Sequence, residues 1–218
     1  MRDYPFNYIE LSKFSNSLPY GGFDHQLNTL FEQLEIQKNQ LNFPAINNDI
    51  GSLISMMCGI ARPKVIFEMG SGYGQSAFWF LNGSTSIEKI ILTEKRSDLI
   101  DVFHALPWPS EWREKISYYN DDAFKIIEQF QSIDIALIDG VKADYKKFLV
   151  ILESRMKTNS LVFIDNSYWR GSFLNSEQVK NKQSARNIYE LHQYIKESKA
   201  WESCFVPYID GLSILKKK

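Results

Sequence analysis

The sequence predicts an α/β fold of the doubly wound kind, with a mostly parallel, seven-stranded sheet, helices on both faces and extra helices at the N-terminus. Three observations predict it. Apolar, strand-like runs alternate with helix-like stretches from about residue 65 onward. A glycine-rich turn follows the first of these runs, and an Asp-Gly turn separates two short strand candidates near the C-terminus. Alternation of this kind indicates a parallel sheet covered on both faces, closed here by an antiparallel hairpin.

Two helices are expected before the first strand. Residues 24–37 carry apolar side chains at three- and four-residue spacing, namely Leu27, Leu30, Phe31 and Leu34. Residues 48–61 repeat the pattern, and Arg62-Pro63 marks the end of that helix. We therefore expect an N-terminal helical cap over residues 1–47 and a core over residues 48–218, together making one domain.

The core elements follow in order. The strand candidates are short apolar runs at 65–69, 89–93, 116–119, 133–138 and 161–164. The helix candidates between them lie at 75–81, 97–103, 123–130 and 143–155. A last helix is predicted at 184–197, and the hairpin strands at 204–207 and 212–216. The polar stretch 171–183 is predicted to be a mobile loop.

Composition excludes few classes of function. The formal net charge of −1 gives no general reason to expect nucleic acid or an anionic membrane as partner. No apolar run approaches the roughly 18 residues that span a bilayer, and no signal segment begins the chain, so a cytoplasmic protein is expected. The two cysteines are far apart, and Cys58 is expected to be a buried free thiol.

The glycine-rich turn is typical of a nucleotide-type cofactor site. After the first strand come Glu68 and three glycines at alternate positions, Gly70, Gly72 and Gly74. Such a turn brings the backbone close to a ligand and points the amides of the next helix at it. The dinucleotide fingerprint would need a glycine where Gln75 stands. A nicotinamide-dependent oxidoreductase is thus a disfavoured alternative, also because no hydride-site motif accompanies the turn.

Acidic residues end five strand candidates in succession. They are Glu68, Glu94, Asp121-Asp122, Asp139 and Asp165-Asn166. Ligands of open α/β sheets bind beyond the carboxyl ends of the strands, so these side chains are candidates for one site. Each could instead be a helix cap or turn former.

The spacing suggests a role for several of them. Glu94 lies 24 positions after Gly70, near the spacing at which an acid binds ribose hydroxyls. Asp122 could reach an adenine amino group, with Ala123 leaving room for the ring. The hard oxygens of Asp139, Asp165 and Asn166 suit Mg²⁺ or a similar cation. Lys142 follows Asp139 by three residues and could act as a base, or be an ordinary surface lysine.

Four motifs together resemble a known family. The acid-x-Gly-x-Gly-x-Gly turn resembles motif I of S-adenosylmethionine (SAM) methyltransferases. Ile-Asp-Gly-Val-Lys-Ala-Asp-Tyr at 138–145 is similar to the Asp-x-x-Lys segment of metal-dependent O-methyltransferases of the catechol and caffeoyl-CoA type. Phe-Ile-Asp-Asn-Ser-Tyr-Trp-Arg-Gly at 163–171 resembles their Asp-Asn metal motif, and Val-Pro-Tyr-Ile-Asp-Gly-Leu at 206–212 their closing hairpin. The resemblance runs from about Phe43 to the C-terminus.

The resemblance implies a Rossmann-like class I methyltransferase that uses SAM and a divalent cation, Mg²⁺ or another. The acceptor would be the hydroxyl of a small catechol-like or phenolic molecule. It assigns the metal to Asp139, Asp165 and Asn166, and the catalytic roles to Lys142 as base together with Asp139. The implied cofactor residues are Ile46, Glu68, Gly70, Gly72, Ser76, Glu94, Asp122, Ala123 and Asp139, with Ile46 near the methionine part and Ser76 on its carboxylate.

Two alternatives and several departures go with this interpretation. Bacterial relatives with these motifs methylate the hydroxylated wobble uridine of tRNA, and Arg170, Lys180, Lys182 and Arg186 could then hold phosphates. A non-catalytic interaction domain is disfavoured by the intact metal and base positions. Asp121 replaces a usual glycine, Lys95-Arg96 replaces an apolar-then-acid pair, and the late acidic residue of the animal catechol enzymes lacks a counterpart. Relatives are often homodimers, so a homodimer is expected, with the aromatic residues Tyr4, Phe6, Tyr8 and Phe14 at its interface or over the acceptor.

Overall fold

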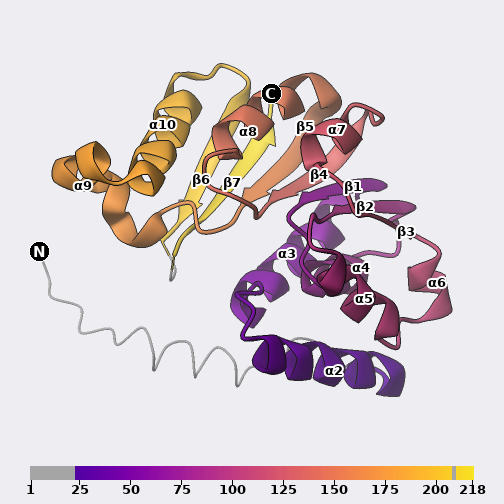
Figure 1. The fold of residues 1–218 in the computed structure, drawn as a ribbon. Coiled ribbons are helices and arrows are strands. Elements are labelled where there is room, and N and C mark those ends of the chain that lie inside the picture. The colour runs from indigo at the N-terminus through magenta and orange to yellow at the C-terminus, as the bar shows by residue number, and fades with distance from the viewer. Residues whose placement is uncertain (1–22, 208–209) are drawn as a thin grey trace, which may run out of the picture.

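The structure, a computed structural model, describes residues 23–207 and 210–218. The aromatic positions expected at an interface or over the acceptor lie outside these residues, as do residues 1–22 of the proposed cap and two residues of the hairpin turn. Seven strands form one sheet in the order β3-β2-β1-β4-β5-β7-β6 (Figure 1). They are β1 (Val65–Met69), β2 (Lys89–Thr93), β3 (Ile116–Tyr119), β4 (Ile133–Ile138), β5 (Met156–Ile164), β6 (Trp201–Val206) and β7 (Leu212–Lys217).

Strand directions match the predicted fold class. The first five strands are parallel, and the strand order reverses direction between β1 and β4, which are neighbours in the sheet. Strand β7 pairs antiparallel with both β5 and β6, which closes the sheet with the expected hairpin. The doubly wound fold is therefore confirmed. Its switch point, between β1 and β4, is where such sheets bind ligands.

Helices cover both faces of the sheet (Figure 1). One face packs against α2 (His25–Leu41), α3 (Asn48–Ala61), α4 (Gln75–Gly83) and α5 (Ser97–Ala105). The other packs against α7 (Ala123–Ile127), α8 (Tyr145–Arg155) and α10 (Gln183–Glu197). Alternating residues of β1 separate into these two cores: Ile66 joins the first, and Phe67 and Met69 join the second. Strands buried on both faces explain why each reads as a continuous apolar run.

The N-terminal helices are fixed by local signals and by packing. Asp24 caps α2, since its side chain accepts a hydrogen bond of 2.9 Å from the Leu27 amide. Helix α3 lies close against α4 because Gly83 has no side chain: a Cβ there would stand 2.3 Å from the Ser55 carbonyl oxygen. Cys58 is buried within this packing and has no disulfide partner, as expected.

The prediction for residues 171–183 is wrong. The structure has a 3₁₀ helix, η1 (Trp169–Leu174), and a short helix, α9 (Ser176–Asn181), in place of a loop. Asn175 begins α9 by accepting hydrogen bonds of 3.0 Å from the amides of Glu177 and Gln178. A further short helix, α6 (Ser110–Arg113), was not predicted. Within the described residues no helix is both long enough and apolar enough to cross a bilayer.

Candidate active site

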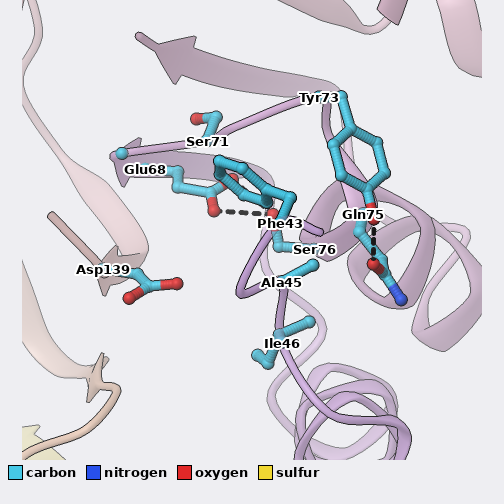
Figure 2. Close-up of a pocket in the computed structure, with 10 residues that line it drawn as sticks. Phe43, Ala45, Ile46, Glu68, Ser71, Tyr73, Gln75, Ser76 and Asp139 are labelled. Atoms are coloured by element: carbon cyan, nitrogen blue, oxygen red, sulfur yellow. Dashed lines mark hydrogen bonds between the residues drawn. The ribbon is translucent and has the colours of Figure 1, made fainter. Parts of the chain in front are cut away.

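A cavity of about 880 Å³ opens at the carboxyl ends of the parallel strands. It is lined by most of the predicted site residues, namely Gly70, Glu94, Asp122, Ala123, Asp139, Lys142, Asp165 and Asn166. A recess of about 20 Å³ adds Ile46, Glu68 and Ser76, and shares Gly70 and Asp139 with the large cavity (Figure 2). The structure thus brings these residues together. Gly72 lines neither space and acts through its backbone instead.

The glycine turn brings the chain after β1 close to the residue that follows β4. Gly70 has φ of +88°, and a Cβ on it would stand 2.2 Å from the carbonyl oxygen of Asp139. Gly72 has φ of +54°, and a Cβ on it would meet the Phe43 ring at 2.6 Å. Both positions therefore require glycine, for the backbone conformation and for the close approach. The turn lets Asp139 lie directly beside the loop.

Glu68 and Ser76 are hydrogen-bonded to each other at the bottom of the recess (Figure 2). The Ser76 hydroxyl lies 2.6 and 2.7 Å from the two Glu68 carboxylate oxygens. Glu68 is only 2% exposed, and this burial raises the pKa of its carboxyl group to about 8. Ser76 was expected to bind a ligand carboxylate. Its hydroxyl already donates to Glu68, so it would have to divide its hydrogen bond between Glu68 and the ligand.

Glu94 holds the loops around the cavity in the structure. One carboxylate oxygen accepts the amides of Lys95 and Arg96 at 2.8 and 3.0 Å, and the other accepts the Gly72 amide at 3.2 Å. These bonds tie the end of β2 to the glycine turn. A carboxylate has about four lone-pair sites, so a ligand hydroxyl could still bond to it.

The end of the cavity predicted to hold adenine is occupied by ion pairs. Asp122 caps α7 by accepting the Phe124 amide at 2.9 Å, which is the helix-cap role considered for it. Its other carboxylate oxygen lies 2.8 Å from the Lys95 ammonium group. Asp121, which stands where the family usually has glycine, pairs with Lys125 on the first turn of α7. Asp121 and Lys95, the two departures from the family pattern, thus both form ion pairs, and these lie at the same end of the cavity.

The opposite end of the cavity gathers two carboxylates, an amide and an amine. Burial raises the pKa of both Asp139 and Asp165, and for Asp139 the negative charge of Asp165 adds to the effect. Lys142 donates to the Asn166 amide oxygen at 3.1 Å and to the Tyr145 hydroxyl. Burial lowers the pKa of the Lys142 amine, against the attraction of the nearby carboxylates.

This arrangement differs from a cluster of ionisable metal ligands. Among the residues that the structure describes, no three His, Cys, Asp or Glu side chains are grouped as they would be around a metal ion. The predicted metal set has only two such residues, and its third member, Asn166, is an amide. Asn166 adopts φ of +49°, a conformation that asparagine tolerates better than most residues.

Sequence reasoning missed several residues that shape the site. Trp169, Asp144 and Asp210 line the large cavity, and the Trp169 ring lies 5.5 Å from the Lys142 ammonium group. Phe43 packs over Gly72 and edge-on to Tyr73, with ring centroids 5.5 Å apart. An aromatic residue before Pro44 was the available signal for Phe43. The others depend on chain segments that meet only in the fold.

Among the basic residues expected to hold tRNA phosphates, Arg186 has a structural role, and the Arg170 side chain lies outside what the structure describes. The Arg186 side chain donates to the backbone carbonyls of Val179 and Lys180, so it holds the end of α9. Lys180 and Lys182 are exposed on the surface. No contact that the structure describes in this region favours a phosphate ligand over solvent.

Comparison with known proteins decides the family. The sequence profile of the O-methyltransferase family matches residues 23–218. The chain belongs to the O-methyltransferase family. This O-methyltransferase is 20% identical, over 180 residues, to the flavonoid 3',5'-methyltransferase of Vitis vinifera, and the match covers 78% of this chain and 77% of that protein.

Solved structures share the fold of the O-methyltransferase. An O-methyltransferase from Bacillus cereus in complex with SAH superposes with a TM-score of 0.81, at 16% identity, over 96% of this chain and 97% of that one. The O-methyltransferase TomG from Streptomyces achromogenes, involved in tomaymycin synthesis and solved with SAM, gives 0.80 at 13% identity over 100% and 99%. At these identities the likeness establishes the fold, which agrees with the sheet order described above.

Proposed function

We propose that this O-methyltransferase transfers the methyl group of SAM to a hydroxyl of a small catechol-like or phenolic acceptor, with a divalent cation bound beside it. One observation carries the proposal. A single cavity joins the glycine turn and Glu94 to Asp139, Lys142, Asp165 and Asn166. A methyl donor and an acceptor could therefore meet inside it, and its volume lies in the range of about 300–1,000 Å³ typical of small-molecule sites.

The cofactor would lie across the switch point of the sheet. Its ribose would bond to Glu94, its adenine to Asp122 beside Ala123, and its methionine part would enter the recess near Ile46 and Ser76. Fold neighbours solved with SAH and SAM support this choice of donor. The tight approach of Gly70 to Asp139 supports it too, because it brings the methionine end next to the candidate acceptor residues.

The donor set near Lys142 fits a hard cation. Two carboxylates and an amide oxygen are the ligand types that Mg²⁺ prefers. Burial and mutual repulsion already disfavour the charged forms of Asp139 and Asp165, and a cation would relieve both effects. When bound, the cation would supply positive charge that stabilises an ionised acceptor hydroxyl. Lys142 would then release the Asn166 oxygen that it contacts in the structure.

Lys142 would accept the proton of the acceptor hydroxyl. A base needs a neutral amine, and burial favours that form by lowering the pKa. The Tyr145 hydroxyl would hold the amine in place, and the Trp169 ring would stabilise the ammonium form once the proton has been taken up. The cavity walls would contribute mainly by orienting the hydroxyl in line with the methyl group.

The proposal is tested by incubating the enzyme with labelled SAM and Mg²⁺ against two panels, catechol-like phenols and bulk tRNA. Label transfer to the phenols, abolished by EDTA and by Asp165→Ala, is the expected result. Asp98→Asn is the matched control, since Asp98 is an exposed carboxylate paired with Arg96 away from the cavity. Transfer to tRNA alone would replace the small acceptor by the wobble uridine. Full turnover in EDTA would remove the metal from the proposal.

The remaining expectations stay predictions. A homodimer is predicted from the resemblance, and a cytoplasmic location from the composition. Analytical ultracentrifugation of the full chain would test the first.

A further inference from the structure

Lys95 lies at a point where carboxylates from three strand ends meet. Its ammonium group is 2.8 Å from one oxygen of Asp122, which follows β3. Glu94 at the end of β2 and Asp144 after β4 also raise the pKa of Lys95, so both are within electrostatic reach. All four residues line the large cavity. Lys95 therefore lies in the wall of the cavity and not on a remote surface.

The ion pair with Asp122 obstructs a ligand. One oxygen of Asp122 already receives the Phe124 amide of α7, and the other receives Lys95. An amino group that approaches Asp122 from the cavity therefore competes with the ammonium group for the same carboxylate oxygen. The pair is open to solvent, with side-chain exposures of 65% and 42%, so it is weak enough for a ligand to break.

Asp144 offers the displaced ammonium group a second partner. It stands at the N-terminus of α8, where its side chain makes no capping hydrogen bond. Within the described residues its carboxylate takes part in no hydrogen bond or ion pair, although its charge acts on Lys95. A half-buried carboxylate that borders a cavity without a partner is well placed to receive a cation from the facing wall.

We infer that Lys95 is a two-position clasp, paired with Asp122 in the empty protein and with Asp144 once a nucleoside amino group has taken Asp122. In the second position its side chain bridges the cavity from the end of β2 to the start of α8, over the bound cofactor. One ion pair replaces another, so the exchange costs little affinity. The inference rests on the proposed cofactor, because it needs a ligand with an amino group at Asp122.

The exchange predicts a specific pattern of SAH affinity in calorimetric titrations. Asp144→Asn takes away the second partner, so SAH should bind roughly two- to fivefold more weakly, the range expected for one exposed ion pair. Lys95→Met removes both pairs, so its affinity should stay within about twofold of wild type by the same reasoning. In the Lys95→Met background, Asp144→Asn should have no effect. Arg96→Met is the matched control, because Arg96 pairs with Asp98 outside the cavity, and it should leave the affinity unchanged.

Stopped-flow measurement of SAH binding gives a second readout. Lys95→Met should make both association and dissociation faster, since the same side chain closes the empty and the loaded site. In about 1 M salt, where exposed charges are screened, the effect of Asp144→Asn should vanish. An equal effect of Asp144→Asn in both backgrounds, no effect in either, or unchanged rates in Lys95→Met would overturn the clasp while leaving the cofactor site in place. Failure of the wild type to bind SAH would overturn the proposed cofactor and the clasp with it.

Discussion

Replacing Glu68 by glutamine should stabilise the protein, and the gain should depend on pH. The Glu68 carboxyl group is 2% exposed, and burial raises its pKa from 4.5 to about 8. In the unfolded chain the group loses its proton near pH 4.5, whereas in the folded protein it keeps the proton until about pH 8. Stability is therefore lost as the pH rises between these two values, because the folded state binds more protons there.

The size of the effect follows from the two pKa values. A difference of one in pKa corresponds to about 1.4 kcal/mol, so the cost of the ionised carboxylate reaches about 3–6 kcal/mol above pH 8. Glutamine has nearly the same shape, can still accept the Ser76 hydrogen bond and carries no charge. The variant should therefore match the wild type at pH 4.5 to 5 and become increasingly more stable toward pH 8, with a constant gain beyond it.

Urea denaturation of both proteins between pH 5 and pH 9 measures this difference. Burial, the largest cause of the raised pKa of Asp139 and Asp165, is the same in both proteins, so that part of their contribution cancels. Glu202→Gln is the matched control, because Glu202 is exposed, pairs with Lys216 at 2.7 Å and has a lowered pKa. It should show no gain at high pH. A stability difference between Glu68→Gln and wild type that does not change with pH would refute the reasoning.

Three further predictions concern the cavity. Glu94→Ala should weaken SAH binding by roughly one to two orders of magnitude, since charged hydrogen bonds of about 1–3 kcal/mol are lost; calorimetry on the folded variant checks it, and unchanged affinity would remove Glu94 from the site. Lys142→Met should slow turnover by about 10²–10⁴-fold at saturating acceptor while SAH affinity is kept. Lys142→Arg should not restore the rate, because guanidinium keeps its proton. Near-normal turnover in both variants would show that Lys142 is not the base. Gly70→Ala should yield little folded protein by circular dichroism, because its Cβ would stand 2.2 Å from the Asp139 carbonyl oxygen; a native spectrum would contradict this.

Local sequence signals were enough for the framework of the fold. Strands β1 to β4 have the predicted bounds because each is an apolar run between turn residues. Helix α3 also begins and ends where its apolar spacing and the following Arg62-Pro63 predict. These features are encoded over a few neighbouring residues, so distant parts of the chain do not change them.

Other elements depend on neighbours that only the fold supplies. Strand β5 begins at Met156, five residues before the predicted start, because Met156 pairs with Ile133 of β4. The residues that follow Met156 are polar and exposed, so no apolar run marks this part of the strand. Helix α9 stands where a loop was predicted, because its polar sequence shows no apolar helical spacing. In the fold it packs beside α10.

The candidate site divides in the same way. Which residues gather was predictable, because strand ends of a parallel sheet share one edge and acidic residues follow each of them. The interactions among these residues could not be predicted. The Lys95–Asp122 ion pair and the hydrogen bond from Lys142 to Asn166 join residues that are far apart in the sequence. The burial that keeps Glu68 protonated likewise comes from several elements packed around it. The sequence by itself determined the sheet, the glycine turn and the acidic edge, since these need only local patterns. Tertiary structure decided the protonation and the pairing of the side chains in the cavity, because burial from water and short distances between charges arise only when packing brings distant segments together.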